Sequence, residues 1–499
     1  MTRLRLNIWN LGTPQDPWHP ITLGYALGVR AMQQLPVADP RSWTYQSAIH
    51  GTYLTSKPSG APWNQCQHAT WYFLPWHRMF LFQFESILRS LLPADDQGSW
   101  ALPFWDYSSG SPGNALPPAF RVDTLPDGTP NPLFVPERRK SVNDGVALPD
   151  VVTGTQQALA DRQFTSAAQG ASVGFGGPQT GFAHQGPAFG QLEAQPHGPV
   201  HVQVGGNGGL MTDPNTAASD PIFWLHHANI DRLWEIWNIG GGANPAAKAW
   251  LDNAFPLRDA TGAAVRMKPR DVLDTVSQLD YTYESLPVRA GFATKEARGV
   301  PEQSQPLLIG TNDRPVEVGR HGATTTLAVT PLPDNTEGLA ARSLAAPRMY
   351  LNVTDIEGSR NPGVVFGVYL NLPDSAASPA TPTPGDPRSP HSPADDPDSP
   401  AADGAAPPDR ADHLAGLISF FGIEDTDPAT AAATRKEPHG MRYSFDVTDI
   451  VDRLRSTGHW QDGTVRVTLL PLAPDDEPER LAADMPAPVR VGTFNLYQG

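Results

Sequence analysis

The stretch HHANIDRLWEIW, His226 to Trp237, decides the expected fold, because two adjacent histidines stand at the start of a strongly amphipathic helix. The preceding Asp220-Pro221 suits the N-cap and first position of that helix, and the glycines at 240–242 close it. A second long helix is expected to open at Phe73-Leu74-Pro75-Trp76-His77 and to stop at Pro93. Two adjacent histidines are unusual in a soluble core, and further histidines lie upstream of them.

Seven of the 14 histidines fall into two dense groups. The first group is His50, His68 and His77, and the second is His197, His201, His226 and His227. His197 and His201 are four residues apart, so on a helix both imidazoles project from one face, as two ligands of one metal require. His77 and His227 each lie near the start of a long helix, where rigid backbone can fix a third ligand per metal.

The ligand types narrow the metal to copper, zinc or iron, because these ions bind imidazole well. Dizinc hydrolases normally have a bridging carboxylate and non-haem iron a facial carboxylate, and neither is evident in this sequence. Two neutral three-histidine sites favour Cu(I) and leave each ion an open position at which O2 can bind between them. Ordinary core or surface histidines are the alternative, and six ligands in two groups count against it.

Composition and charge restrict the remaining classes. A chain of 499 residues predicts two or three domains. Its net charge of -16 counts against nucleic acid as a partner, and its apolar runs are too short to span a bilayer. The N-terminus lacks the apolar region of a secretory signal, so a cytoplasmic location is expected, with export alongside a partner left open. Cys66 is the single cysteine, so no intramolecular disulfide is expected.

The amino-acid composition of the chain changes along its length. Residues 108–190 are rich in Gly, Pro and Ser and predict long surface loops with short helices. The β-rich segments that follow are typical of an antiparallel sandwich or barrel, and they are Thr324–Val329, Met349–Val353, Val364–Leu370, Met441–Val447, Val465–Leu470 and Val489–Leu496. Between them, residues 373–412 form a Pro/Ser/Asp-rich insertion that is expected to be disordered.

The histidines lie in motifs that resemble the two copper signatures of the type 3 copper family, which includes tyrosinases, catechol oxidases and molluscan hemocyanins. These motifs are HATWYFLPWHRMFLFQFE from His68, HGPVHVQVGG from His197 and DPIFWLHHANIDRLW from Asp220. DPRSWTYQSAIHG (39–51), ALPFWDY (101–107) and Tyr281-Thr-Tyr283 are similar to further pieces of the family. The resemblance covers residues 1 to about 290 strongly and the β-rich remainder more weakly.

This resemblance implies the architecture: a mainly α dicopper domain with a four-helix bundle and long loops at 1–290, a linker at 291–302, and a C-terminal antiparallel β-sandwich or barrel at 303–499. It also implies the copper ligands. His50, His68 and His77 would bind copper A, and His197, His201 and His227 copper B. In the family the second histidine of the pair is the ligand, so His226 would pack against the ligands or support them. Asp231 would orient the helix or hydrogen-bond a ligand, or else form an ion pair with Arg232.

Cys66 lies two residues before His68. In fungal tyrosinases and molluscan hemocyanins the same spacing carries a thioether bond between the cysteine sulfur and the imidazole. The resemblance therefore implies a Cys66–His68 cross-link, which would restrict the rotation of His68. An inert buried thiol is the alternative reading of a lone cysteine.

Four further residues are placed in the active site by the resemblance. Glu193 matches the plant glutamate that holds a water near the copper pair and helps deprotonate the phenol. Gly198 stands where many bacterial tyrosinases have Asn, and this departure counts against hydroxylation of monophenols. Val202 would present an apolar wall to the substrate ring, and Pro214 falls near the position of a bulky gate over copper A.

The expected function is the oxidation of o-diphenols or o-aminophenols by O2 to o-quinones or quinone imines. The alternative is a tyrosinase that also hydroxylates monophenols, and a hemocyanin-like oxygen carrier is a more distant one because the chain has no repeats. The expected partners are a small phenol and O2, with a copper-delivery chaperone and the oligomeric state left open. In related proenzymes a C-terminal domain covers the copper site, and 285–302 and 373–410 are candidate cleavage stretches here.

Overall fold

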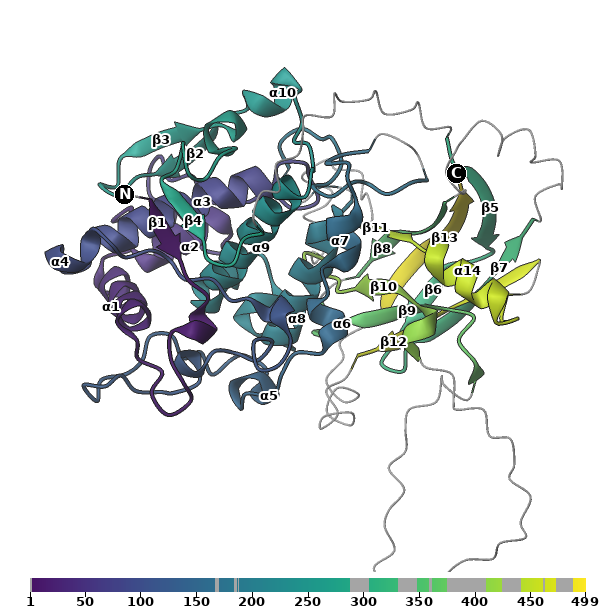
Figure 1. The fold of residues 1–499 in the computed structure, drawn as a ribbon, viewed down its shortest axis with the longest axis horizontal. Coiled ribbons are helices and arrows are strands. Elements are labelled where there is room, and N and C mark those ends of the chain that lie inside the picture. Colours follow the sequence, from purple (N-terminus) through teal and green to yellow (C-terminus); the bar gives the residue numbers. More distant parts are fainter. Residues whose placement is uncertain are drawn as a thin grey trace, which may run out of the picture.

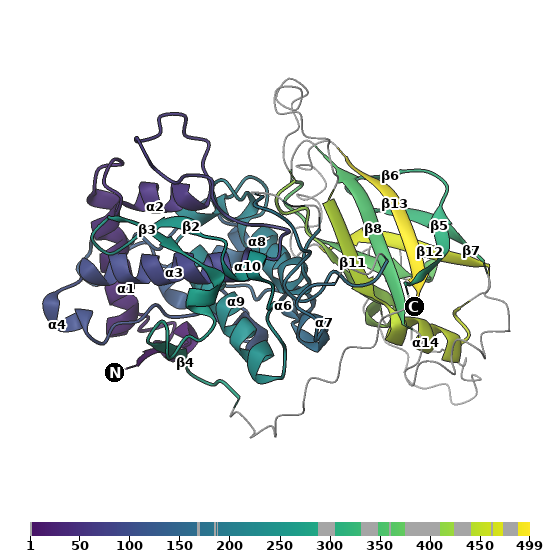
Figure 2. The same cartoon turned by 90° about the horizontal axis from the view of Figure 1, so that it is seen from above.

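The structure is a computed structural model, and it describes residues 2–166, 170–183, 186, 188–287, 305–330, 348–358, 361–374, 410–423, 441–460, 463–472 and 488–499. A helical part lies beside a β-rich part, and the two are in contact (Figures 1 and 2). The predicted linker 291–302 lies outside the described residues. Only the ends of the predicted insertion 373–412 lie within them.

The helical part is organised by its longer helices, which are α1 (Pro20–Gln34), α2 (Trp43–His50), α3 (Phe73–Ser90), α8 (Gly198–Gly205) and α9 (Ile222–Ile239). The short helices on its loops are α4 (Ala94–Gln97), α5 (Lys140–Asn143), α6 (Asp150–Thr153), α7 (Gln156–Ala160) and α10 (Lys248–Leu251). The two long helices predicted from the sequence are α3 and α9. A carboxylate oxygen of Asp220 accepts a hydrogen bond from the Ile222 amide at 3.0 Å, so Asp220 caps the start of α9 as expected.

A buried charge network fixes α9 against α3. The carboxylate of Asp231 on α9 forms an ion pair with Arg78 on α3 and a second with Arg5, whose Nη1 lies 3.4 Å away. It also accepts hydrogen bonds from the hydroxyls of Tyr281 at 2.6 Å and Tyr283 at 2.5 Å. Arg5 lies on strand β1 (Arg3–Arg5), and the two tyrosines lie on strand β4 (Tyr281–Tyr283). The two strands pair in parallel. The network joins the two ends of the helical part to the helices that carry His77 and His227.

The ion pair between Asp231 and Arg232 that the sequence offered as an alternative is not formed. Arg232 lies 3.3 Å from Asp106 instead. Successive residues of a helix point in directions about 100° apart, so neighbours in the sequence do not face each other. None of the hydrogen-bond partners of Asp231 given above is a histidine. Its side chain orients α9 and does not hold an imidazole.

The described residues of the C-terminal part form a nine-stranded antiparallel sheet in the order β10-β9-β12-β7-β5-β13-β8-β11, with β6 paired to β13. The strands are β5 (Leu307–Asn312), β6 (Val316–Val318), β7 (Ala323–Val329), β8 (Met349–Glu357), β9 (Phe366–Leu370), β10 (Leu414–Ile418), β11 (Met441–Asp446), β12 (Thr464–Pro471) and β13 (Val489–Gln498). Its end strands β10 and β11 are also in contact, which makes the sheet barrel-like. Helix α14 (Thr448–Ser456) packs against β8.

The two parts share a hydrophobic interface. Val365, Leu417 and Phe421 of the β-rich part belong to the buried cluster that fills the helical part. Hydrogen bonds also cross the interface, from Arg139 to the Gly363 carbonyl oxygen at 2.8 Å and at further points. The β-rich part is therefore seated firmly on the helical one.

The predicted order of a helical part followed by an antiparallel β part is confirmed, and the six predicted β-rich segments all contain strands. The four-helix bundle stays a prediction. Among the described helices, none has both the length and the apolar character needed to cross a bilayer.

Candidate metal centre

The six histidines predicted to bind metal come from separate elements and meet in the interior of the helical part. His50 ends α2, His68 lies in the loop before α3, His77 is in α3, His197 is the N-cap of α8, His201 is in α8 and His227 is in α9. All six side chains are buried, with at most 2% of their surface exposed. Long-range folding has thus collected imidazoles that are up to 177 positions apart, from 50 to 227, at one place.

The first predicted group is compact. The ring centres of His50 and His68 are 5.2 Å apart, and His77 lies 5.5 Å from each of them. Phe73 lies one helical turn before His77, and its ring centre is 4.7 Å from that of His77. The three rings are therefore neighbours, with an aromatic wall on the side of α3. The donor atoms that lie within 4.8 Å of one another belong to His50, His77 and His227, and to His50, Cys66 and His68.

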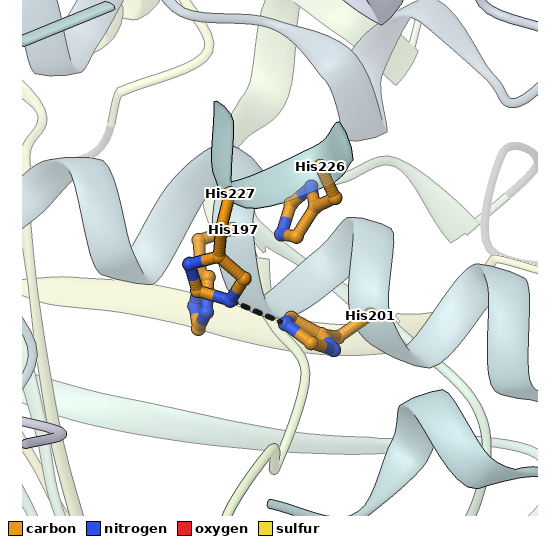
Figure 3. Close-up of side chains that lie close together, drawn as sticks. All are labelled: His197, His201, His226 and His227. Carbon is orange, nitrogen blue, oxygen red and sulfur yellow. Dashed lines mark hydrogen bonds between the residues drawn. The ribbon is translucent and has the colours of Figure 1, made fainter. Parts of the chain in front are cut away.

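The second predicted group is equally compact. The ring of His197 lies 4.6 Å from that of His201 and 5.0 Å from that of His227. The Nε2 atoms of His201 and His227 are 3.3 Å apart, and a dashed line marks this contact in Figure 3. Two nitrogens at this separation match neighbouring ligands around one metal ion with bonds of about 2 Å. The rings of His77 and His227 stack at 4.3 Å, so the two groups are adjacent.

Backbone carbonyls orient three of these rings. The Nδ1–H of His50 donates to the Pro214 oxygen, that of His77 to the Phe73 oxygen, and that of His201 to the Met211 oxygen, each at 2.8 Å. Because a carbonyl oxygen only accepts, these bonds place the proton on Nδ1 and leave the Nε2 lone pair for a metal. This is the arrangement in which proteins present histidine to metal ions.

Burial keeps the imidazoles of His77, His197, His201 and His227 neutral. It lowers the pKa of His77 and of His201 to about 3 and moves the pKa of His197 and of His227 well below its ordinary value. The neutral ring is the form that binds metal, so the site needs no proton release at neutral pH. Without a metal, several of these buried nitrogens have no hydrogen-bond partner among the described residues, including Nε2 of His77 and both nitrogens of His197. An all-imidazole donor set of this kind fits copper.

Family models match most of the helical part. The model of the common central domain of tyrosinase matches residues 40–239, and that of the polyphenol oxidase middle domain matches 246–291. A model of a domain of unknown function matches 400–498. Tyrosinase HcTyr1 of Hahella sp. (strain CCB-MM4) is 32% identical to this chain over 95% of the chain and 96% of that protein.

The chain belongs to the tyrosinase family of type 3 copper proteins. It is accordingly a copper-dependent oxidoreductase that oxidises phenols. The chloroplastic polyphenol oxidase of Malus domestica is 32% identical over 53% of this chain and 46% of that protein, so the chain spans about half the length of such plant relatives. The structure of latent apple tyrosinase has a similar fold, with a TM-score of 0.61 at 21% identity, over all of this chain and 97% of that one.

In this tyrosinase-family enzyme, Cys66 is buried and its sulfur lies 3.4 Å from Nδ1 of His68. The short chain segment between them brings the sulfur alongside the imidazole. The predicted thioether bond stays a prediction, and the position of the sulfur next to the ring is compatible with it.

Glu193 stands in a π-helical turn (Glu193–His197) that leads into α8. Its two carboxylate oxygens accept hydrogen bonds from the Ala69 amide at 2.9 and 2.8 Å, and burial raises the pKa of this carboxyl well above its ordinary value. Ala69 directly follows His68 and has a φ of 53°. Glu193 therefore holds the turn that presents His68, and its predicted role in binding a water is untested.

The three predicted pocket residues, Pro214, Val202 and Gly198, lie in three different surroundings. Pro214 is buried beside the first group, because its carbonyl oxygen accepts the hydrogen bond of His50. Val202 is fully buried in the core of the helical part. Gly198 faces the β-rich part, since a side-chain carbon added there would lie 2.5 Å from Oγ of Ser419.

Sequence reasoning did not identify Phe421. Its ring, which is 1% exposed, stacks on His201 at 4.3 Å and meets the edges of His197 at 5.3 Å and His68 at 5.6 Å. It also did not identify Phe223, whose ring lies 4.3 Å from His227. The position of Phe223, four residues before His227 on a helix, was a usable signal for that residue.

Proposed function

We propose that this enzyme uses O2 to oxidise o-diphenols, or the similar o-aminophenols, to o-quinones or quinone imines at two copper ions. His50, His68 and His77 would hold copper A, and His197, His201 and His227 copper B. The observation that carries the proposal is the meeting of these six buried imidazoles in adjacent groups of donor atoms that contain no carboxylate. The packing of α3 against α9 supports a four-helix core of α2, α3, α8 and α9 around the ions.

The residues of the chain supply geometry and exclusion of water. The carbonyls of Pro214, Phe73 and Met211 fix three rings before any metal arrives, so little reorganisation accompanies binding. Copper supplies the electron transfer and the open position for O2. Each o-diphenol gives up two electrons and two protons, so two o-diphenols reduce one O2 to two waters. Glu193 would take up a phenolic proton once its carboxylate leaves the Ala69 amide.

A parallel assay of three substrates tests this assignment. Copper-loaded enzyme freed of the β-rich part is expected to oxidise a catechol and an o-aminophenol at least about tenfold faster than a monophenol. The reasons are that Gly198 offers no side chain to orient a water and that Glu193 is bound to the Ala69 amide. O2 uptake with each substrate is the measurement. Rapid monophenol turnover without a diphenol primer would favour the tyrosinase alternative.

We also propose the Cys66–His68 thioether, because the sulfur and the imidazole already lie side by side. Formation of the C–S bond breaks the thiol S–H bond and an imidazole C–H bond, and the two hydrogen atoms reduce one O2 to hydrogen peroxide once copper is bound. The peptide that contains both residues is expected to be lighter by two hydrogen atoms after copper loading in air. Mass spectrometry of that peptide decides the matter, with Cys66→Ala as the control that cannot form the bond. An unchanged mass in active enzyme would rule out the cross-link.

We propose further that the β-rich part keeps the enzyme latent. Phe421 stacks on His201, which is where the ring of a phenol must come to reach the metal. The fold resembles that of latent apple tyrosinase, which supports this reading. The candidate cleavage stretches 285–302 and 373–410 lie largely outside the described residues. Activation therefore requires that the segment around Phe421 leave the site, either by cleavage or by movement of the β-rich part.

A further inference from the structure

We propose that His226 is a fourth imidazole donor at the copper B position, and that it binds copper there with His197 and His201 while only one ion is present. The inference rests on the proposed copper site. It adds a residue that the six-ligand set leaves out, and it concerns how the first ion is held.

The environment of His226 is unusual for a packing residue. The side chain is fully buried, and neither ring nitrogen has a hydrogen-bond partner among the described residues. Its ring lies 5.4 Å from that of His197 and 4.7 Å from that of His201. Burying a polar group without a partner is unfavourable, and an apolar ring would fill the same space at lower cost. The two nitrogens therefore point to a ligand.

The position of His227 provides the second observation. One of its ring nitrogens lies within 4.8 Å of those of His50 and His77, and its ring is nearly parallel to that of His77, at 10°. His227 also belongs to a group with His197, His201 and His226 whose nitrogens lie within the same limit. Figure 3 shows His226 and His227 projecting from the same helix toward His201.

Because the nitrogens of His227 also reach His50 and His77, copper B does not depend on His227 alone for a third imidazole. His197, His201 and His226 then provide three imidazoles for one ion, a set that suits Cu(I). When a second ion takes the first group, with His68 as its third donor, His227 is free to bind copper B. His226 is thus a donor of the one-copper state, and His227 of the two-copper state.

The affinity for the first ion tests the proposal. Full-length, copper-free protein is titrated anaerobically with Cu(I) against a chromogenic Cu(I) chelator. His226→Phe keeps the ring and removes the nitrogens, so it is expected to weaken the first binding step at least about tenfold. His227→Phe is expected to leave that step within about twofold of the wild type, because His197, His201 and His226 all remain. His413→Asn is the control, since His413 is buried in the β-rich part and its Nδ1 donates to the Leu370 oxygen.

A spectroscopic measurement keeps the proposal testable even if His226→Phe does not fold. Pulsed electron paramagnetic resonance of the double variant His50→Phe/His227→Phe, whose first group keeps only two imidazoles, is expected to detect three coupled imidazoles with one equivalent of Cu(II). Two imidazoles, or an unchanged first affinity in folded His226→Phe, would overturn the inference and leave His226 as a packing residue. Failure of the proposed function would appear differently, as wild-type protein that binds no copper or oxidises no phenol.

Discussion

Replacement of His227 by Asn is expected to lower phenol oxidation by at least about a thousandfold and to leave about one firmly bound copper ion per chain, because a single ion does not reduce O2 by four electrons. His227 has the contacts that a shared position between the ions requires, since its Nε2 lies 3.3 Å from that of His201 and its ring stacks on His77. Copper per chain and O2 uptake with catechol are the measurements, made on protein freed of the β-rich part.

His413→Asn provides the control for this variant, because it removes an imidazole that is equally buried but lies in the β-rich part. With excess copper, His226→Asn is expected to retain two ions per chain, since the two-copper state uses His227. The assignment of copper B would be wrong if His227→Asn kept both ions while His226→Asn lost one.

Replacement of Phe421 by Ala is expected to raise the activity of the uncleaved enzyme at least about tenfold. Truncating a buried Phe to Ala removes about 3–5 kcal/mol of packing, and here most of that packing holds the closed state. A shift of about 1.4 kcal/mol in the equilibrium between covered and open sites is already a tenfold change in open enzyme. The measurement is the initial rate with catechol before and after limited proteolysis. Cleavage is expected to activate the wild type strongly and the variant much less.

The neighbouring Phe420 offers a matched control. It is equally buried, but its ring packs on Phe366 in the core of the β-rich part, 5.5 Å away, and does not face the histidines. Phe420→Ala therefore loosens the packing of the β-rich part and leaves the Phe421 ring on His201. Equal activation of both variants would show that general loosening, and not the position of the Phe421 ring, controls access. Unchanged wild-type activity after cleavage would contradict latency altogether.

Local sequence patterns carried much of the correct prediction. The amphipathic periodicity and the flanking proline and glycine residues located α3 and α9 to within a few residues. The spacing of His197 and His201 predicted that their imidazoles project from one face, and their ring centres lie 4.6 Å apart. In the folded chain His197 is the N-cap of α8 and the last residue of a π-helical turn, a detail that spacing alone does not contain.

What the sequence did not reveal depends on long-range contacts. Phe421 lies 220 positions after His201, in a segment without a metal motif, so nothing local connects it with the site. For Asp231 the sequence left open a helix-orienting role and an ion pair with Arg232, and its actual partners Arg5 and Arg78 come from the N-terminal strand and from α3. Both cases depend on how distant elements pack, and the period of a single helix carries no information about that packing.

The central claim is that two groups of three imidazoles hold a pair of copper ions. Its most direct test is the metal content of the full-length chain after loading with excess copper and removal of unbound ions, combined with X-ray absorption at the copper edge. The account predicts two copper ions per chain, each with three imidazole nitrogens among its neighbours. One ion per chain, or copper bound chiefly through sulfur or carboxylate oxygen, would contradict it.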